Sequence, residues 1–318
     1  MASQMAPSSI QSYHPGRDGG CAVTVGYDVD MPAAANGLDY LYGREIPWLS
    51  GETTDATSHL SDDVWAYVDR LCAAAEEYGA KLQFFLQGNA FERPFEGWVR
   101  VVERGHAVDS HMYNHISLLH EPLDVIERQA GETRELLSGK LGTIAVGVRG
   151  PGGYRTGLDG RQDVQQALLR AGVKWVSTKY VYSGKASAET EPPTIVGIAD
   201  CQPYWYGTGL LEIPFCCYQD RHFFDSDMGG DPSRPLGEWI AYLKRAVDHA
   251  HDHNLFLNLT VHPSTSFKHD REGLYLREVL AYCRTKPDVV VATYGDVYRW
   301  LAADLRDGTP QESLPDTA

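Results

Sequence analysis

The amino-acid sequence predicts an α/β protein built as a closed or nearly closed barrel, and three observations support this. Strand-like and helix-like segments alternate seven or eight times along the chain, and such alternation implies a parallel sheet. The length of 318 residues suits one α/β barrel, which commonly has about 250 residues. Residues able to do chemistry also stand at several predicted strand ends, where enzymes of this architecture place their sites.

The predicted strands are short apolar runs, several of which end in a charged or histidine side chain. The first, at residues 21–27, reads CAVTVGY and has the composition of a buried strand. The later strands follow the same pattern at residues 81–88, 106–111, 145–151, 174–179, 209–215, 255–263 and 288–294.

The predicted helices carry apolar residues at helical spacing and are bounded by glycine or proline. The helix that begins at residue 62 stops at Gly79, and the helix of residues 121–142 has Pro122 in its first turn. The other helices are predicted at residues 95–105, 161–172, 236–254, 271–285 and 295–308. We expect one catalytic barrel at residues 21–306, with an N-terminal arm at 1–20 and a C-terminal tail at 307–318.

Composition excludes several classes of partner. The net charge of −15 argues against nucleic acid, which would need a basic face. No apolar run approaches the roughly 18 residues of a membrane span, and the first residues lack the apolar segment of a secretory signal, so we expect a cytoplasmic protein. The six cysteines include no CxxC pair, which favours reduced, buried thiols. A homo-oligomer is left open.

Two aspartates follow the first predicted strand with one residue between them. Alternation along a strand puts Asp28 and Asp30 on the same side. Carboxylates this close repel each other unless a cation or a proton lies between them. A surface turn is the alternative interpretation, but the apolar run before Asp28 favours a position in the barrel wall.

Three histidines stand near other strand ends. His111 and His115 are four residues apart, so in a helical turn both rings would lie on one face. With one carboxylate they could complete a set of two histidines and one acid for zinc or another divalent metal. His262 could act as a general acid. Taken singly, these histidines are more often partly exposed or core residues.

The order D-x-D, H-x-x-x-H, R-x-P and a strand-end histidine resembles the polysaccharide deacetylase family, also called the NodB-like domain or carbohydrate esterase family four. The resemblance covers about residues 21–303 and implies a distorted, incomplete (β/α)7 barrel. It implies hydrolysis of N-acetyl or O-acetyl groups with a divalent metal ion, most often Zn2+. The implied metal ligands are Asp30, His111 and His115.

The resemblance also implies catalytic roles. Asp28 corresponds to the catalytic base, Arg149 to the arginine that orients it, and His262 to the catalytic acid. A fourth motif would fall near Glu212 and Pro214, although LEIPF lacks the usual tryptophan.

Departures from the family pattern point to an atypical branch. Val29 separates two aspartates that are usually adjacent, as in members that look like intracellular peptidoglycan-deacetylase-like and allantoinase- or imidase-like proteins. Met112 replaces a serine or threonine, and the third motif, RGPGGYR, has extra glycines before Tyr154.

Four residues are predicted to contact the substrate: Tyr154, Trp48, Trp205 and Glu212. Aromatic rings could stack on a sugar, and packing of a loop against the barrel is about equally compatible with them. We expect the charged stretch CCYQDRHFFDSD to be a solvated loop, in preference to a lid.

The sequence therefore predicts a hydrolase acting on carbon–nitrogen bonds other than peptide bonds, with a small-molecule or oligosaccharide substrate. An N-acetylated or O-acetylated carbohydrate is placed first. The alternatives are a small linear or cyclic amide, such as a ureide or imide, and a non-catalytic barrel that binds carbohydrate or protein.

Overall fold

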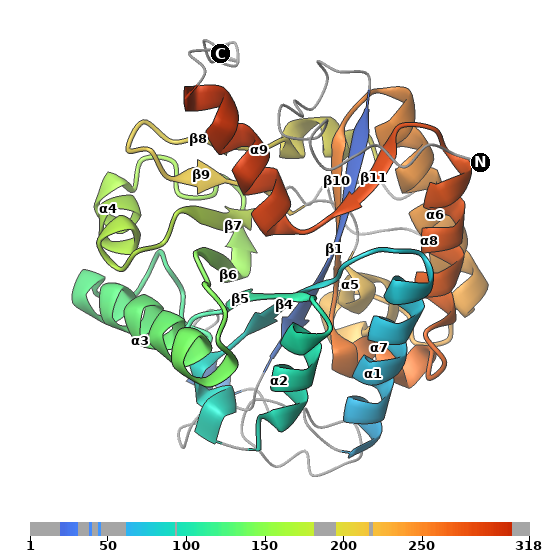
Figure 1. Ribbon diagram of the computed structural model, residues 1–318, viewed down its shortest axis with the longest axis horizontal. Coiled ribbons are helices and arrows are strands. Elements are labelled where there is room, and N and C mark those ends of the chain that lie inside the picture. Colours follow the sequence, from blue (N-terminus) through green and yellow to red (C-terminus); the bar gives the residue numbers. More distant parts are fainter. Residues whose placement is uncertain are drawn as a thin grey trace.

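The computed structural model describes residues 20–30, 38–39, 44–45, 62–92, 94–180, 195–215 and 219–306. A curled parallel sheet forms its centre, with helices along the outside (Figure 1). The described part of the chain has these strands: β1 (Cys21–Val29), β2 (Leu38–Asp39), β3 (Arg44–Glu45), β4 (Gln83–Leu86), β5 (Ala107–Ser110), β6 (Gly147–Tyr154), β7 (Trp175–Lys179), β8 (Tyr204–Trp205), β9 (Leu211–Glu212), β10 (Phe256–Val261) and β11 (Val289–Ala292).

The order of the strands confirms the predicted incomplete barrel. Seven parallel strands follow one another as β10-β1-β4-β5-β6-β7-β9, and β8 adds an antiparallel edge. β11 pairs with the first half of β1, while β4 pairs with its second half. β1 is therefore paired on both sides along most of its length. Because successive side chains of a strand point to opposite faces, every second side chain of β1 points into the barrel interior.

Alternation along β1 separates the core from the site. Its odd-numbered residues, among them Tyr27 and Val29, join the core that packs against the outer helices. Its even-numbered residues face inward, where Gly26 leaves space: a Cβ there would lie 3.2 Å from the Arg149 guanidinium. The same periodicity places Asp28 at the carboxyl end of the strand, on the interior side.

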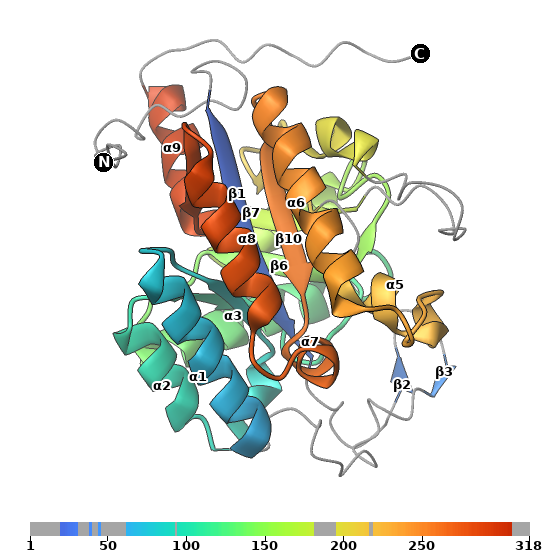
Figure 2. The ribbon, with the colours of Figure 1, turned by 90° about the vertical axis from the view of Figure 1, so that its right-hand side faces the viewer.

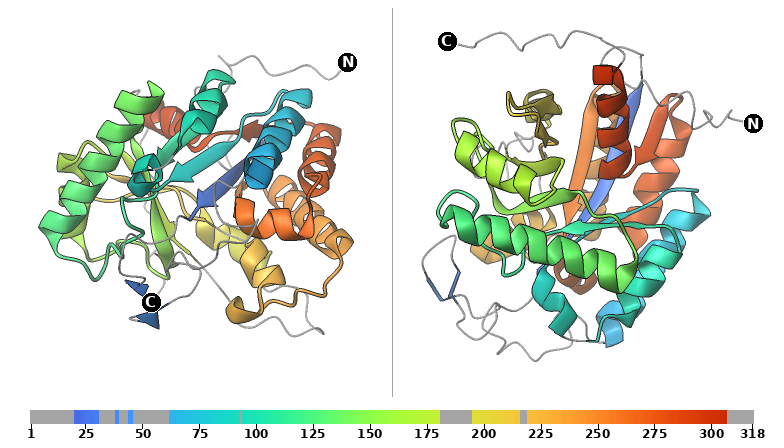
Figure 3. Two further views of the ribbon diagram at one scale, coloured as in Figure 1. Left: turned by 90° about the horizontal axis from the view of Figure 1, so that it is seen from below. Right: turned by 60° about the vertical axis from the view of Figure 1, so that its left-hand side comes forward.

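The helices cover the outer face of the sheet, as the end view shows (Figure 3, left). α7 and α5 lie at the lower end in Figure 2, where β1 and β10 end. The described helices are α1 (Asp62–Glu77), α2 (Glu96–Glu103), α3 (Leu123–Leu141), α4 (Gln162–Arg170), α5 (Asp220–Phe224), α6 (Leu236–Asp252), α7 (Pro263–His269), α8 (Leu274–Thr285) and α9 (Tyr294–Arg306). The predicted longer helices are confirmed, whereas α5 and α7 were not predicted.

In the described chain the sheet ends at β10 on one side and at β8 on the other. Two side-chain amides bridge this opening. Gln202 donates to the carbonyl of Phe256 at 3.0 Å and accepts from its N–H at 2.8 Å. Asn258 donates to the carbonyl of Pro214 beyond β9. These bonds occupy backbone groups that a further strand would otherwise pair, so the open sheet keeps a defined curl.

The structure also bears on the predictions for the cysteines, for membrane spans and for the two terminal segments. The cysteines within the described residues are buried free thiols: Cys21, Cys72, Cys201 and Cys283. Among the described helices, none has the length and apolar character needed to cross a membrane. The predicted arm, except for Gly20, and the predicted tail at residues 307–318 lie outside the described residues.

One acid in the sheet interior is unrelated to the predicted site. The Asp109 carboxyl on β5 accepts hydrogen bonds from the backbone N–H groups of Val146 and Gly147 at 3.0 and 2.9 Å, and from the Gln83 amide at 3.1 Å. Burial outweighs these bonds and raises the pKa of Asp109 to about 7. The neutral carboxylic acid is therefore the form that the fold favours.

We expect the contribution of Asp109 to the stability of the protein to fall as the pH rises from about 4 to above 7. In the unfolded chain Asp109 ionises near pH 4, whereas in the folded chain it keeps its proton to about pH 7, so the ionised group favours unfolding. Asp109→Asn cannot ionise and should flatten this dependence by at most about 4 kcal/mol, since one pKa unit corresponds to about 1.4 kcal/mol. Denaturant unfolding at pH 5 and pH 8 measures the effect.

The matched control is Asp159→Asn, which changes an exposed aspartate and should follow the wild-type curve. An equal loss of stability for Asp109→Asn at both pH values would contradict the assignment.

Candidate active site

The carboxyl end of β1 brings two carboxylates to the interior side of the sheet. Asp28 pairs in register with Phe85 of β4, whose ring lies in the interior cluster of the barrel. Asp30 follows two residues later, and both carboxylates are buried. The spacing of two therefore aims both groups at one place, as the sequence predicted.

The two histidines follow β5 in a tight turn that differs from the predicted helical turn. Met112 and His115 both have left-handed backbone conformations, with φ of 61° and 54°. Gly88 N–H donates to the Met112 carbonyl at 3.0 Å, and Asn114 N–H donates to the Gln129 side chain at 3.1 Å. Because these bonds hold the turn, the rings of His111 and His115 still meet, with their centroids 4.9 Å apart.

Asp30, His111 and His115 form a group of ligand atoms that lie within 4.8 Å of one another. Asp30 Oδ1 is 3.3 Å from His111 Nε2 and 3.5 Å from His115 Nε2. His111 Nδ1 donates to the Arg149 carbonyl at 2.8 Å, which leaves the Nε2 lone pair directed at the group. Two imidazole nitrogens and a carboxylate oxygen are a donor set that suits zinc.

The electrostatics of this group favour the states that a metal ion needs. Burial lowers the pKa of His115 to about 3, so its ring is neutral and its lone pair is available. Burial alone would raise the pKa of Asp30, but the neighbouring His115, His111 and His262 hold it well below its usual range. Within the described chain, buried Asp30 Oδ1 accepts no hydrogen bond. An oxygen with no hydrogen bond is available to a metal ion.

Arg149 lies in the barrel interior beside Asp28. Its side chain is 0% exposed, and its Nε is 3.7 Å from Asp28 Oδ1. Its terminal nitrogens donate to Thr260 Oγ1 at 3.2 Å and to the Tyr294 hydroxyl at 2.6 Å. The guanidinium also lies 4.6 Å from the centre of the Phe85 ring. These contacts fix its position, so its charge offsets that of Asp28.

His262 follows β10 and is held by an acid that sequence analysis did not assign. Asp220 Oδ1 accepts from His262 Nδ1 at 2.7 Å, and Asp220 Oδ2 accepts from the His262 N–H at 2.7 Å. Burial alone would lower the pKa of His262, but Asp220, with smaller contributions from Asp30 and Asp28, raises it above its ordinary value. The arrangement suits a histidine that carries a proton to a leaving group.

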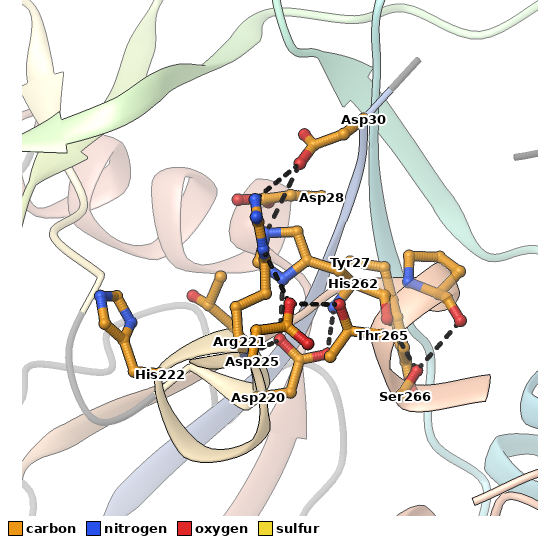
Figure 4. Close-up of polar contacts among 12 residues, drawn as sticks. Tyr27, Asp28, Asp30, Asp220, Arg221, His222, Asp225, His262, Thr265 and Ser266 are labelled. Carbon is orange, nitrogen blue, oxygen red and sulfur yellow. Dashed lines mark hydrogen bonds and ion pairs between the residues drawn. The ribbon is translucent and has the colours of Figure 1, made fainter. Parts of the chain in front are cut away.

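The stretch predicted to be a solvated loop instead supplies part of the site. Asp220 is 0% exposed and begins α5, and the next residue, Arg221, points its guanidinium toward Asp30 (Figure 4). The adjacent Phe223 and Phe224 pack in the core. Two neighbouring aromatics within a charged stretch were the signal that this segment is anchored.

Two predicted substrate contacts lie away from the site. Glu212 is 0% exposed, and its carboxylate accepts hydrogen bonds from the Thr178 hydroxyl and N–H and from the Tyr206 hydroxyl. A substrate cannot reach it in this structure. Trp205 pairs with Leu211, the first residue of β9, so it lies near the amino ends of the strands rather than the carboxyl ends.

Of the other two predicted substrate contacts, Tyr154 has a structural role and Trp48 is not among the described residues. Tyr154 lies at the carboxyl end of β6, with a buried ring, and its hydroxyl accepts from the Leu118 N–H at 2.7 Å. It therefore holds the segment that follows the histidine turn. Gly152 and Gly153 before it have positive φ and form the irregularity between β6 and β7 that the extra glycines allow. Trp48 lies outside the described residues.

The fold and these motifs can now be compared with known proteins. Residues 53–176 match the family model for polysaccharide deacetylase. No curated protein matches the sequence significantly.

Among solved structures, a protein from Mycobacterium smegmatis assigned as a polysaccharide deacetylase is 21% identical, with a TM-score of 0.67, covering 95% of this chain and 96% of that one. A protein with the same assignment from Pseudomonas aeruginosa PAO1 is 19% identical, with a TM-score of 0.65 and coverage of 94% and 96%. The Puue allantoinase is 18% identical, with a TM-score of 0.64 and coverage of 95% and 98%.

These similarities show the fold, and the family match adds sequence evidence over part of the chain. The match at residues 53–176 supports the predicted resemblance to the polysaccharide deacetylase superfamily, whose members are hydrolases. The similarity to solved structures confirms the predicted incomplete barrel.

We expect Asp220→Asn to lower kcat/KM about 10- to 100-fold. This is the loss typical when a residue that orients a functional side chain by a hydrogen bond is changed. An amide in place of the carboxylate cannot accept both the His262 ring N–H and the backbone N–H. Steady-state kinetics on any substrate hydrolysed by the wild type measures the loss.

Asp270→Asn is the matched control, because this buried aspartate accepts the Tyr275 backbone N–H and has no bond to His262. Equal kinetic losses in the two variants, after correction for folded fraction, would show that Asp220 has no specific role.

Proposed function

We propose that the protein is a metal-dependent hydrolase that removes acetyl groups from an N-acetylated or O-acetylated carbohydrate. The observation that carries this proposal is the gathering of a base, an acid and three ligand atoms at one end of the sheet. Asp28 and His262 come from adjacent strand ends, Asp30 follows β1, and His111 and His115 follow β5. A barrel that only binds a partner has no need of this combination.

The protein's own side chains have defined tasks in this reaction. Asp28 would take the proton of the attacking water, and Arg149 would hold that carboxylate in place and offset its charge. His262, fixed by Asp220, would donate a proton to the leaving nitrogen or oxygen. The reaction thereby divides proton uptake and proton donation between two groups, Asp28 and His262.

The donor set of Asp30, His111 and His115 fits a divalent metal ion, with Zn2+ as the first candidate. Such an ion would polarise the scissile carbonyl and lower the pKa of water beside it. The three residues would hold it through one carboxylate oxygen and two Nε2 atoms. The Arg149 carbonyl keeps the His111 ring in the orientation needed for this task.

A second candidate is hydrolysis of a small linear or cyclic amide. Arg221 favours it, because a guanidinium directed at the site suits a compact, charged substrate better than a neutral sugar polymer. The structural similarity to an allantoinase is compatible with it but shows only the fold.

We expect the purified protein to contain about one divalent ion per chain. His111→Ala should lose that ion, because it removes one of three ligand atoms. Asp28→Asn should retain the ion and lose about 100- to 10,000-fold in hydrolysis, the usual contribution of a general base. Elemental analysis and a hydrolysis screen of acetylated sugars, ureides and imides provide the measurements.

His120→Ala, at an exposed histidine, is the control and should change neither metal content nor rate. A protein without metal, in which His111→Ala and Asp28→Asn have no effect, would indicate a non-catalytic binding barrel instead.

A further inference from the structure

The two oxygens of the Asp30 carboxylate face different groups. Oδ1 faces the Nε2 atoms of His111 and His115 at 3.3 and 3.5 Å. Oδ2 faces Arg221 Nη1 at 3.7 Å and His262 Nε2 at 3.9 Å. Asp30 therefore lies between two sets of groups. On one side are the two histidines that would hold a metal ion, and on the other are the proposed proton donor, His262, and the positively charged Arg221.

Arg221 is held firmly in this position. Its Nε donates to Asp225 Oδ2 at 3.2 Å, and Asp225 Oδ2 also accepts from the Thr265 hydroxyl at 3.3 Å. The side chain of Arg221 is 13% exposed, so it is largely enclosed yet still accessible. Figure 4 shows it extending from α5 past Asp225 toward Asp30, next to His262. Anchoring at Nε fixes the direction of the terminal nitrogens.

The geometry has a consequence for the substrate. A general acid must come within hydrogen-bond distance of the leaving atom, so the amine half of the substrate lies beside His262. Arg221 Nη1 lies within 4 Å of the same Asp30 oxygen as the acid, so the amine half also meets the guanidinium. Arginine binds carboxylates through charge-assisted, often paired, hydrogen bonds.

We propose that Arg221 determines specificity by binding a carboxylate on the amine half of the substrate. The class of substrate is an amide whose released amine carries a carboxylate group close to the nitrogen. This inference rests on the proposed hydrolytic site and favours the second candidate, a small linear amide, over a neutral acetylated sugar. It adds that Asp225 acts as a positioning residue that keeps Arg221 aligned. The negative net charge of the chain does not oppose it, because the local charge of a site outweighs the total charge.

The test uses two probes that differ only in this group, N-acetylglycine and neutral N-acetylglycinamide. The metal-loaded wild type should show a kcat/KM at least tenfold higher for N-acetylglycine. Arg221→Gln should lower that value 10- to 100-fold more than it lowers the value for the amide, so the preference for N-acetylglycine should be lost. Arg221→Lys should lie between the two, since it keeps the charge but loses the planar fork. Equal losses on both probes would overturn the proposal.

Binding gives a readout that does not depend on turnover. In the Asp28→Asn background, calorimetry should show tighter binding of N-acetylglycine than of N-acetylglycinamide, and Arg221→Gln should abolish the difference. Asp225→Asn should weaken the preference less than Arg221→Gln. Arg155→Gln, which changes an exposed arginine one residue beyond β6, is the control and should leave the preference intact.

The two proposals can fail separately. Preferential binding that depends on Arg221, with no metal-dependent hydrolysis of either probe or of the acetylated sugars, ureides and imides of the screen, would overturn the reaction and support the recognition role. Hydrolysis with no preference for the carboxylate, in both the wild type and Arg221→Gln, would overturn the recognition role and support the reaction.

Discussion

The burial of opposite charges inside a sheet is the constraint on which this structure depends. Arg149 has no exposed surface, and a guanidinium taken out of water is costly unless it is paired and hydrogen-bonded. Asp28 supplies the negative charge, while Thr260 and Tyr294 accept hydrogen bonds. Gly26 provides the space. The barrel interior at this level is thus built around one ion pair rather than around apolar packing alone.

Arg149 also connects the two halves of the proposed chemistry. Its side chain lies against the proposed base, Asp28, and its backbone carbonyl accepts a hydrogen bond from the His111 ring. A displacement of β6 would therefore disturb the base and a ligand together. The bulge that follows Arg149 confines the irregular, glycine-rich backbone to residues beyond this point, so the two contacts rest on regular strand structure. Rigid elements of this kind place reactive groups more precisely than loops do.

Site residues that depend on local sequence could be predicted, whereas those that depend on tertiary packing could not. The alternation of a strand placed Asp28 and Asp30 on one side, and strand ends indicated His262, because both depend on neighbours in sequence. Asp220 was missed because its partner, His262, is 42 residues away and the pairing depends on how α5 packs. Trp205 was assigned to the substrate from residue type, and Glu212 from its place in a predicted strand and near the fourth family motif. Which end of the sheet a side chain occupies, and whether it is sealed by partners, depends on tertiary structure.

Asp220 and Arg221 are adjacent residues on the short helix α5, yet they contact different parts of the site. Successive residues of a helix point about 100° apart, so neighbouring positions can serve different partners. Asp220 is buried beneath His262, and Arg221 extends toward Asp30. Phe223 and Phe224 anchor the same segment in the core. The proposed proton donor and the proposed substrate cation therefore share one support, so a rearrangement of α5 that altered substrate recognition would also alter the alignment of the acid. The burial of Phe223 and Phe224 explains why a charged segment outside the barrel strands is packed closely against them.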